Sequence, residues 1–377
     1  MKYRKIGDTE VSVLGLGCMR LDTVTENGKT RIDMNNFENM MRYAIDSGVN
    51  YFDTAYMYHD GESEIALGKV VKKLGVRDKI NIATKLPHWN INGEDDVDRL
   101  INEQFKKLDT DYFDFYLLHD MSRKVWDEKI IKFGVVEKLL KYKIEGRIKH
   151  LGFSFHDDLD AFKYIVDLSG SVFEFCQLQV NYADAAAHHQ AGLEGLEYAA
   201  AHNLAVVIME PLKGGYLANT AEHITKELPT GRTPVEYALD FLWNRPEVTI
   251  ILSGMNNMKQ LEENIEYASR SDIGMLYEDE IRKLLKAGDV FNSGANVQCT
   301  ACAYCMPCPA GIKIPEVFKL YNLCASVYTW ETGPKQKYKK LEKHASDCLK
   351  CRKCEKMCPQ HLKISEIMND VDKTMNE

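Results

Sequence analysis

The sequence lacks three features that would assign it to other classes of protein. It has no apolar run near the roughly 18 residues that a membrane-spanning helix requires. The first residues, MKYRKIGDTEVSV, are polar and contain no apolar core of a secretory signal. Basic residues do not predominate: 48 Lys and Arg face 56 Asp and Glu, for a formal net charge of −8, which disfavours general binding to nucleic acid. We therefore expect a cytoplasmic protein that works neither in a membrane nor on nucleic acid.

Cysteine is scarce over most of the chain and abundant at one end. Of the 11 cysteines, only Cys18 and Cys176 lie in the first 298 residues. In a reducing compartment, closely spaced cysteines are more often metal ligands than disulfide partners. The formal charge is −12 for residues 1–290 and +4 for residues 291–377. A chain of 377 residues has room for two domains, and we predict one over 1–290 and a second over 291–377.

Short apolar runs alternate with amphipathic stretches through the first 290 residues. The runs are rich in Val, Ile, Phe and Tyr and end in turn residues, which is typical of strands. The eight runs are VSVLGLG (11–17), VNYFDTA (49–55), INIATK (80–85), FDFYLLH (113–119), IKHLGFS (148–154), FCQLQVN (175–181), AVVIMEP (205–211) and TIILSG (249–254). Between them, apolar residues recur every three or four positions, as they do in helices.

Eight strand–helix units in about 270 residues match the size of a parallel (β/α)8 barrel. An open, doubly wound sheet is the alternative, because periodicity does not show whether a sheet closes. No Gly-x-Gly-x-x-Gly follows the first strand-like run, which argues against the Rossmann form of such a sheet. We therefore predict the α/β class, with a TIM barrel followed by the cysteine-rich region.

The most specific local pattern is the run CLKCRKCEKMCP at residues 348–359. Its spacing, C-x2-C-x2-C-x3-C-P, is that of bacterial ferredoxins, in which three cysteines bind one [4Fe–4S] cluster and the fourth binds another. A second run, CTACAYCMPCP (299–309), also ends in Cys-Pro but has only two residues before its last cysteine. The two runs predict a small, mostly helical, ferredoxin-like domain that carries two [4Fe–4S] clusters.

Exchange of the fourth cysteine between the runs defines two ligand sets. One set is Cys299, Cys302, Cys305 and Cys358, and the other is Cys308, Cys348, Cys351 and Cys354. Zinc is the alternative metal, because two C-x2-C pairs make a good tetrahedral site. Eight cysteines in two runs exceed what one zinc ion requires, which favours iron–sulfur clusters. Cys324 belongs to neither set, and we interpret it as a buried apolar thiol.

Four polar residues end or follow three successive strand-like runs. They are Asp53 and Tyr58 in FDTAYMYHDGESEIALG, Lys85 in IATKLP and His119 in YLLHD. In a barrel, the carboxyl ends of the strands form the active site. With these residues the chain resembles the aldo-keto reductase family, which uses an Asp, Tyr, Lys and His tetrad on the second, third and fourth strands. The resemblance covers residues 3 to 290, and the cysteine runs resemble those of a subgroup with a C-terminal ferredoxin-like domain.

These residue types are consistent with carbonyl reduction. Hydride transfer to a carbonyl carbon builds negative charge on the oxygen, which then needs a proton. A tyrosine has an ordinary pKa of about 10 and donates poorly near neutrality. An adjacent Lys85 ammonium would lower the pKa of Tyr58, with Asp53 orienting the lysine. His119 would donate to the carbonyl oxygen. Tyr58 is thus interpreted as the general acid in reduction and the base in oxidation.

The resemblance also implies a nicotinamide cofactor, NADP or NAD, lying across the mouth of the barrel. In the family, its carboxamide is held after the fifth strand and on the sixth, which here correspond to Ser154 and Gln177. The usual Ser-Asn pair reads Ser154-Phe155 in this chain. Met209 stands where an aromatic residue often stacks on the nicotinamide, and Met is a soft substitute.

The segment SGMNNMKQLEENI (253–265) resembles the part of the family that holds the adenosine phosphates. A helix N-terminus there can receive phosphate, and Lys213 in PLKGG is a candidate for the pyrophosphate. The matching residues are Gly254, Asn256, Gln260, Glu263 and Asn264. Gln260 stands where many members have an arginine for the 2′-phosphate. NADPH, which is the family's default, and NADH therefore both stay open.

Three functions are compatible with the sequence. The first is a reductase of a small-molecule carbonyl, or an alcohol oxidoreductase, whose clusters are structural or regulatory; Trp89 and Trp126 are candidate walls of its pocket. The second passes electrons through the clusters to a ferredoxin-like partner, and it needs a two-to-one electron converter such as a flavin. The third is a non-catalytic redox sensor or electron-carrier subunit. The complete tetrad favours an enzyme, an NAD(P)-dependent oxidoreductase.

Overall fold

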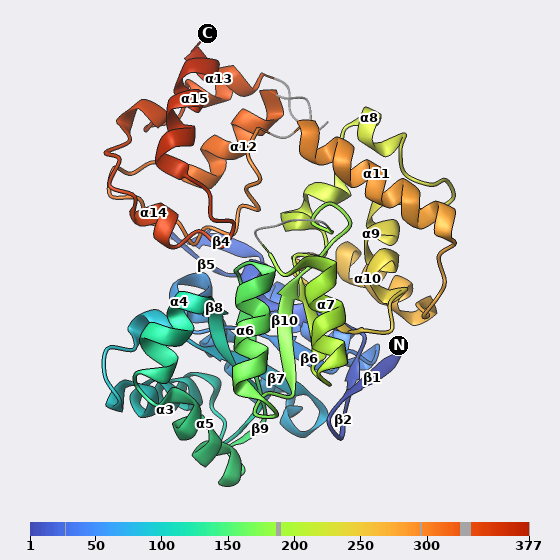
Figure 1. Cartoon of the computed structure of the whole chain (residues 1–377), viewed down its shortest axis with the longest axis vertical. Helices are drawn as coiled ribbons and strands as arrows, with labels where there is room; N and C mark the ends of the chain where they lie inside the picture. The colour runs from blue at the N-terminus through green and yellow to red at the C-terminus, as the bar shows by residue number, and fades with distance from the viewer. Residues whose placement is uncertain (27, 186–189, 295, 325–332, 377) are drawn as a thin grey trace. The chain divides into compact units, whose positions relative to one another are not determined.

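The computed structural model of the chain describes residues 1–26, 28–185, 190–294, 296–324 and 333–376. The chain forms two compact units (Figure 1). The first comprises Met1–Val180, Ala191–Pro211 and Leu242–Met275, and the second comprises Asn181–Gln190, Leu212–Phe241 and Leu276–Glu377. The second unit thus includes residues upstream of 291, and the domain boundary at residue 290 stays a prediction.

The first unit is built on eight parallel strands. In chain order they are β3 (Leu14–Gly17), β6 (Tyr51–Asp53), β7 (Asn81–Leu86), β8 (Phe113–Met121), β9 (Ile148–Phe155), β10 (Phe175–Gln179), β11 (Ala205–Met209) and β12 (Val248–Ser253). Each strand pairs in parallel with the next, and β12 pairs with β3, so that the sheet closes. The predicted barrel is confirmed, and the open sheet is excluded.

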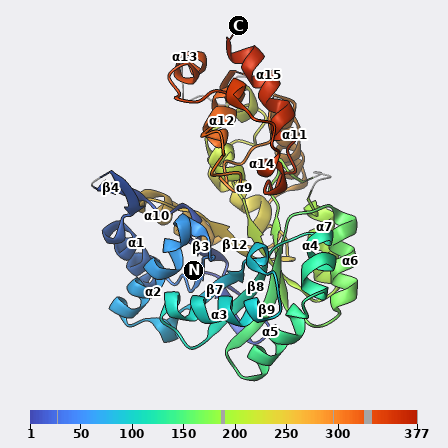
Figure 2. The ribbon, with the colours of Figure 1, turned by 90° about the vertical axis from the view of Figure 1, so that its left-hand side faces the viewer.

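Helices follow the strands around the outside of this barrel (Figure 2). The α-helices are α1 (Met34–Asp46), α2 (Glu62–Leu74), α3 (Asp95–Leu108), α4 (Arg123–Val125), α5 (Val135–Ile144), α6 (Leu159–Ser169), α7 (Gly192–Ala201) and α10 (Met258–Arg270). The shorter turns are η1 (Cys18–Arg20), η2 (Tyr58–Gly61), η3 (Arg77–Lys79), η4 (His88–Asn90) and the π-helical η5 (Trp126–Ile131). Capping residues set several boundaries: the Asp33 carboxylate accepts hydrogen bonds from two backbone N–H groups at the start of α1, and α2 ends at Gly75 in the left-handed conformation.

A small antiparallel hairpin contributes to the core at one end of the barrel. Its strands are β1 (Tyr3–Ile6) and β2 (Thr9–Ser12), and a second hairpin is formed by β4 (Thr23–Glu26) and β5 (Lys29–Ile32). The single strand predicted over residues 11–17 is therefore wrong, because it is divided between β2 and β3. At the division, the backbone N–H of Ser12 donates to the Asn50 side chain and its hydroxyl donates to the carbonyl of Leu14.

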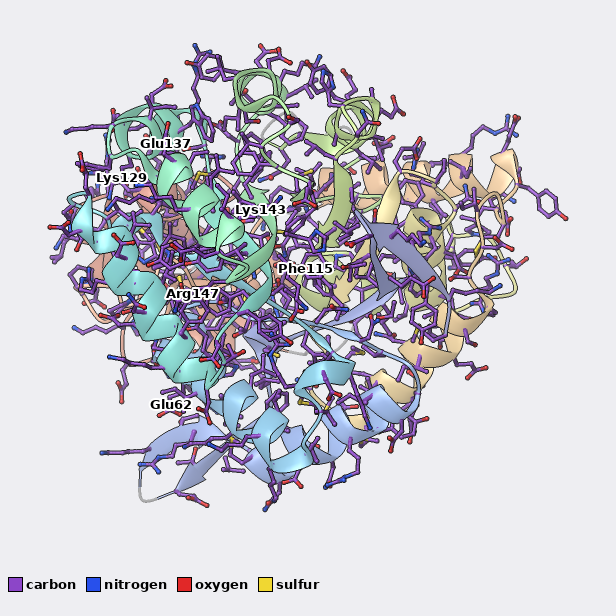
Figure 3. All side chains as sticks on the ribbon, turned by 90° about the horizontal axis from the view of Figure 1, so that it is seen from below. Glu62, Phe115, Lys129, Glu137, Lys143 and Arg147 are labelled. Atoms are coloured by element: carbon purple, nitrogen blue, oxygen red, sulfur yellow. The ribbon has the colours of Figure 1, made fainter. Side chains whose placement is uncertain are left out.

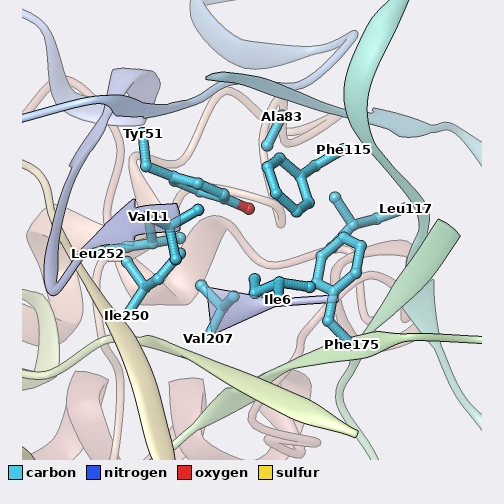
Figure 4. Packing of buried hydrophobic residues seen from close by; sticks show 10 residues of the cluster. All are labelled: Ile6, Val11, Tyr51, Ala83, Phe115, Leu117, Phe175, Val207, Ile250 and Leu252. Atoms are coloured by element: carbon cyan, nitrogen blue, oxygen red, sulfur yellow. The ribbon is translucent and has the colours of Figure 1, made fainter. Parts of the chain in front are cut away.

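The barrel interior below the strand ends is filled with apolar side chains. Ile6 and Val11 of the hairpin pack with residues from the barrel strands (Figure 4). The strand residues of this cluster are Tyr51, Ala83, Phe115, Leu117, Phe175, Val207, Ile250 and Leu252. Seen from below, Phe115 lies in the middle while Glu62 and Glu137 lie on the surrounding helices (Figure 3). The interior is thus a packed core, which leaves the other end of the barrel for polar residues.

Two glycines permit close backbone approaches in this unit. A Cβ on Gly68 of α2 would lie 2.7 Å from the backbone of Leu108 at the end of α3. A Cβ on Gly152 of β9 would lie 2.5 Å from the carbonyl oxygen of Phe175. Any side chain at either position would clash with backbone, so these glycines set the spacing of α2 against α3 and of β9 against β10.

The second unit contains helices and no strand among its described residues. They are η6 (Lys213–Ala218), α8 (Glu222–Thr225), α9 (Pro234–Trp243, whose last two residues belong to the first unit), α11 (Glu278–Gly294), α12 (Ile314–Cys324), α13 (Pro334–Tyr338), η7 (Ala345–Asp347), α14 (Lys353–Lys356) and α15 (Ile364–Asn376). Side chains tie its loops together: the Asn322 amide exchanges two hydrogen bonds with the backbone of Val297, and Gln190 donates to the carbonyl of Pro359 at 2.8 Å. Within the described ranges, no helix has both the length and the apolar composition needed to cross a bilayer.

Candidate functional site

The four tetrad residues come together at the carboxyl ends of three neighbouring strands. Asp53 ends β6, Tyr58 begins η2 just after it, Lys85 lies near the end of β7, and His119 lies near the end of β8. All four side chains are buried. The ammonium Nζ of Lys85 donates to Asp53 Oδ1 at 2.6 Å and to the carbonyl of Thr54 at 2.8 Å. It lies 3.5 Å from the hydroxyl of Tyr58, so the lysine bridges the carboxylate and the phenol.

Lys85 keeps its positive charge in this arrangement. Burial favours the neutral amine, but the charge interactions with Asp53 and Tyr58 outweigh burial and raise the pKa of Lys85. Buried ammonium groups are stable only when they are paired and hydrogen-bonded. Lys85 meets this condition through Asp53 and Thr54. The Lys85 ammonium therefore lies beside the Tyr58 hydroxyl.

His119 lies near Tyr58 and is a neutral imidazole. The two ring centroids are 6.1 Å apart in an edge-to-face arrangement. Burial, followed by repulsion from the charge of Lys85, holds the pKa of His119 well below its usual range. A neutral imidazole carries one N–H donor, so His119 can donate a hydrogen bond without contributing a charge.

The two candidate tryptophans occupy different environments. The ring of Trp89 lies 5.1 Å from that of His119 and 4.9 Å from that of His88, all measured between centroids. Burial lowers the pKa of His88 to about 4, so this histidine is neutral as well. Trp126 is buried and packs edge-to-face against Phe173. Trp89 thus borders the tetrad, whereas Trp126 is part of the packing around η5.

A buried polar network lies directly behind Lys85. The fully buried carboxylate of Glu64 on α2 accepts hydrogen bonds from Thr84 at 2.6 Å and from the Gln104 amide at 2.7 Å. That amide also donates to the backbone carbonyl of Lys85 at 3.0 Å, and Lys107 lies 3.3 Å from the carboxylate. The network therefore links α2 and α3 to strand β7 at Lys85, the candidate catalytic residue.

We expect the Glu64→Ala substitution to destabilise the chain by about 2–4 kcal/mol, because it leaves buried donors on Thr84 and Gln104 without their acceptor. Glu64→Gln keeps one acceptor oxygen and should lose less. Urea unfolding followed by circular dichroism would measure both. Glu62→Ala, at an exposed carboxylate on the same helix, is the control and should change stability by less than about 1 kcal/mol. Equal losses for positions 62 and 64 would contradict the role of the network.

The residues predicted to hold the nicotinamide lie on adjacent strands. Ser154 of β9 and Gln177 of β10 are register partners, and Met209 ends β11. The Ser154 hydroxyl accepts a hydrogen bond from the backbone of Asp120 at 2.8 Å. Gln177 is buried, and its Oε1 has no hydrogen-bond partner among the described residues. A buried carbonyl oxygen without a donor is an unusual feature, and it fits a site that receives an amide from a ligand.

The segment after β12 folds into a capped helix start. The Asn257 side chain accepts from the backbone N–H of Gln260 at 3.0 Å, and the Gln260 side chain accepts from the backbone N–H of Asn256 at 3.0 Å. Asn264 is buried and donates to Ser253 at 3.0 Å. Glu263 lies 3.8 Å from Lys259. Gln260, Glu263 and Asn264 thus lie on the first two turns of α10, and Asn256 directly precedes the N-cap residue Asn257.

Arg20 is a residue near this segment that the sequence analysis missed. Its side chain lies against Gly254, within 3.3 Å of where a Cβ on that glycine would stand. Its guanidinium lies 3.4 Å from Glu210, the residue after β11. No motif in the sequence marks Arg20, because its neighbours Glu210 and Gly254 are far from it along the chain. Glu64 was equally missed, although it lies within the motif around Asp53 and Tyr58.

Lys213 is the candidate contact of the cofactor's pyrophosphate. It belongs to the second unit, where it is buried and forms an ion pair with the buried Asp184. A lysine that is already paired and hydrogen-bonded satisfies its own charge. A contact of Lys213 with the pyrophosphate stays a prediction.

The predicted cluster ligands line two cavities of the second unit. One cavity is lined by Cys299, Cys302, Cys305 and Cys358, and the other by Cys308, Cys348, Cys351 and Cys354. Each cavity takes three cysteines from one run and one from the other, as the exchange of the fourth cysteine requires. Ile314 and Ile364 line both cavities, so they form part of the wall between them.

The described cysteine thiols of the second unit surround cavities and do not converge on the position of a single metal ion. None of the ten cysteines with described side chains is in a disulfide. Within the described residues, no three His, Cys, Asp or Glu side chains converge closely enough to hold a single metal ion. Four thiolates around a cavity suit a cubic cluster better than one zinc ion. The side chain of Cys324 lies outside the described part of the chain.

The fold and these two regions together define an oxidoreductase barrel joined to an iron–sulfur domain. The chain belongs to the aldo/keto reductase family, because the model of that family matches residues 13–282. A 4Fe-4S dicluster domain matches residues 298–363. The family membership and the C-terminal ferredoxin-like domain predicted from the sequence are therefore confirmed.

Relatives agree with this membership, and solved structures share the fold of the barrel. The chain is 28% identical over 319 residues to the oxidoreductase YqkF of Bacillus subtilis, covering 75% of this chain and 95% of that protein. It is 26% identical to L-galactose dehydrogenase of Arabidopsis thaliana, covering 70% of this chain and 87% of that protein. The barrel of aldo-keto reductase AKR11C1 from Bacillus halodurans superimposes with a TM-score of 0.62 at 23% identity, covering 76% of this chain and 96% of that one. An aldo-keto reductase from Klebsiella pneumoniae, solved in complex with NADPH, has a TM-score of 0.60 at 21% identity, covering 76% and 95%.

Proposed function

We propose that the chain is an NAD(P)H-dependent oxidoreductase that reduces an aldehyde or ketone, or runs the reverse alcohol oxidation. The observation that carries the proposal is the position of the Lys85 ammonium, 2.6 Å from Asp53 and 3.5 Å from the Tyr58 hydroxyl. A buried cation beside a phenol stabilises the tyrosinate left after proton donation. The phenol at this position is thus suited to give a proton to a carbonyl oxygen and to take it back from an alcohol.

The remaining tetrad residues orient and polarise the substrate. The neutral imidazole of His119 donates a hydrogen bond to the carbonyl oxygen and aims it at the Tyr58 hydroxyl. Asp53 fixes the Lys85 side chain, so that the ammonium stays next to Tyr58 throughout turnover. Trp89 forms an aromatic wall beside His119. A bound nicotinamide supplies the hydride in this chemistry.

The cofactor that we propose is NADP or NAD, held along the ends of β9, β10, β11 and β12. Ser154 and Gln177 would hold the carboxamide, which the lone Oε1 of Gln177 supports. Met209 would lie against the ring. The adenosine end would lie on Gly254 and the first turns of α10, where Arg20 adds a cation that suits a phosphate. The NADPH bound by the Klebsiella reductase is consistent with this proposal.

The second unit, in this proposal, holds two [4Fe–4S] clusters. Its two cavities, each lined by four cysteines, carry this part of the proposal. The clusters are structural or exchange electrons with a ferredoxin-like partner. Because assembled clusters and free thiols require a reducing compartment, we propose a cytoplasmic location.

An anaerobic assay of the full chain tests the proposal. NADPH or NADH would be added with a panel of aldehydes and ketones while nucleotide oxidation and the visible absorbance of the clusters are both recorded. We expect that a carbonyl compound causes oxidation of one of the two nucleotides. If the clusters are structural, their visible absorbance should stay constant during this turnover. Cluster bleaching by the nucleotide would identify them as electron carriers. Nucleotide binding without turnover on any carbonyl would overturn the reductase proposal and favour a sensor or carrier subunit.

A further inference from the structure

One patch of the second unit combines an exposed cluster ligand, an exposed apolar side chain and several cations. It consists of Leu349, Lys350, Cys351, Arg352, Lys353 and Lys356, which we name the Cys351 surface. Of the eight cluster cysteines, only Cys351 is exposed. Leu349 is 68% exposed, which is high for a leucine. Both residues also line the cavity of Cys308, Cys348 and Cys354.

The backbone holds this patch in a fixed shape. Lys350 and Arg352 have φ angles of 53° and 56°, in the left-handed region that non-glycine residues seldom adopt. They flank Cys351, and α14 (labelled in Figure 1) begins directly after Arg352. The chain thereby curves around the cavity, so that cysteines line it while the intervening basic side chains stay exposed. Such strained residues are frequent at functional sites.

The cations of the patch are largely uncompensated. Lys350, Lys353 and Lys356 are exposed, and no carboxylate of the described residues lies within ion-pairing distance of them. Arg352 is 4.0 Å from Glu355, which also accepts a hydrogen bond from the backbone of Ser365. The neighbouring Lys343, in contrast, pairs with Asp347 at 3.3 Å. The patch thus combines four exposed cations with the exposed side chain of Leu349, on a chain with a net charge of −8.

We propose that the Cys351 surface docks an acidic one-electron carrier protein, and that the cluster beneath it is the one that exchanges electrons. This inference rests on the two clusters of the proposed function. An apolar centre with a charged rim is the usual anatomy of a docking site, and opposite charge speeds the encounter. In the exchange, the reduced cluster loses one electron and the carrier gains it, and no bond or proton is transferred.

The two cavities have different positions in this scheme. The cavity of Cys308, Cys348, Cys351 and Cys354 reaches the surface at Cys351, whereas the four cysteines of the other cavity are only partly exposed. Electron tunnelling slows steeply with distance, so the exposed ligand favours exchange at the first cavity. Ile314 and Ile364 line both cavities, so the two clusters would be neighbours.

The test measures electron transfer from the reduced full chain to two carrier proteins of opposite charge. The clusters are reduced with dithionite, the excess is removed, and oxidation by acidic plastocyanin or by basic cytochrome c is followed by stopped flow at low ionic strength. The first triple variant is Lys350→Glu, Lys353→Glu and Lys356→Glu. The control is Lys335→Glu, Lys339→Glu and Lys340→Glu, which changes the net charge equally at exposed lysines outside the cavity lining.

We expect the first triple variant to slow oxidation by plastocyanin about tenfold or more, and the control by less than about threefold. Oxidation by cytochrome c should not slow in the first variant, and added salt should shrink the difference with plastocyanin. Clusters that reduce normally but give equal rates in both variants would overturn the docking surface alone. A wild-type chain without reducible clusters would overturn the proposed clusters, and this proposal with them.

Discussion

Replacing Tyr58 with Phe is expected to lower kcat by roughly 10²–10⁴-fold, because the substitution removes one hydroxyl that serves as general acid and base. The phenol is buried, with the Lys85 ammonium 3.5 Å from its hydroxyl and the ring of His119 nearby. Neither neighbour can replace it: Lys85 is held by Asp53 and Thr54, and burial keeps His119 neutral. Loss of the hydroxyl should therefore leave no positioned proton donor.

The Tyr58→Phe variant should bind the nicotinamide cofactor almost as the wild type does. The proposed cofactor residues Ser154, Gln177 and Met209 lie on β9, β10 and β11, away from the strand that Tyr58 follows. Single-turnover kinetics and a fluorescence titration with NADPH would separate the two effects. A fall in kcat with an unchanged Kd would match a group that acts only on the substrate.

Tyr56 provides the matched control for this variant. It lies two residues before Tyr58, and its hydroxyl donates to Glu103 at 2.8 Å, outside the tetrad. Tyr56→Phe removes the same atom from the same loop and should retain kcat within about threefold. If Tyr58→Phe turned over carbonyl substrates at the wild-type rate, the assignment of Tyr58 would be wrong. If both variants failed alike, the loop and not the hydroxyl would be responsible.

The second large effect is expected from pairs of cysteine substitutions. Cys299→Ala combined with Cys358→Ala removes two ligands that line one cavity. This variant should lose that cluster and keep the other complete, so that iron falls by about half, to about four atoms per chain. Cys299→Ala combined with Cys308→Ala removes one ligand from each cavity. This second variant should keep no cluster with a full set of four thiolates.

The two double variants carry the same number of substitutions, so each is the control for the other. Iron and acid-labile sulfide per chain, and the electron paramagnetic resonance spectrum after dithionite reduction, would be measured for both. If each sequence run bound its own cluster, the pattern would reverse, and the variant at 299 and 308 would retain the complete cluster. That outcome would refute the exchange of the fourth cysteine. Because metal binding and folding are coupled, far-UV circular dichroism should accompany the iron analysis.

The element types of the barrel could be predicted from the sequence, and one strand boundary could not. Apolar runs of strand length identified all eight barrel strands, because their side chains face a core on both sides of the sheet. The run at 11–17 is divided between β2 and β3 because its first half pairs antiparallel with β1. An apolar run alone does not contain the identity of its partner strand, so this division depended on tertiary contacts.

Some residues of the candidate site could likewise be predicted from the sequence, and others could not. Asp53, Tyr58, Lys85 and His119 could be predicted because each lies at the end of a strand-like run, where parallel strands bring their carboxyl ends together. The role of Glu64 could not, since it depends on Thr84 and Gln104, which lie on two other elements. The same holds for Arg20, whose neighbours Glu210 and Gly254 are about 200 residues away along the chain. The motif around Lys213 likewise does not reveal its ion pair with Asp184, which lies 29 residues away along the chain.

The sequence by itself determined the parts of this protein: a (β/α)8 barrel with a tetrad at its strand ends, and a C-terminal region with two cysteine runs. Local spacing carries that information, because strand length, helical period and Cys-x2-Cys repeats are written in neighbouring residues. Only the tertiary structure decided which groups meet. It set the Lys85 ammonium between Asp53 and Tyr58, and it left Cys351 exposed beside unpaired lysines. Distances and exposure arise from packing between distant segments, and no local pattern encodes them.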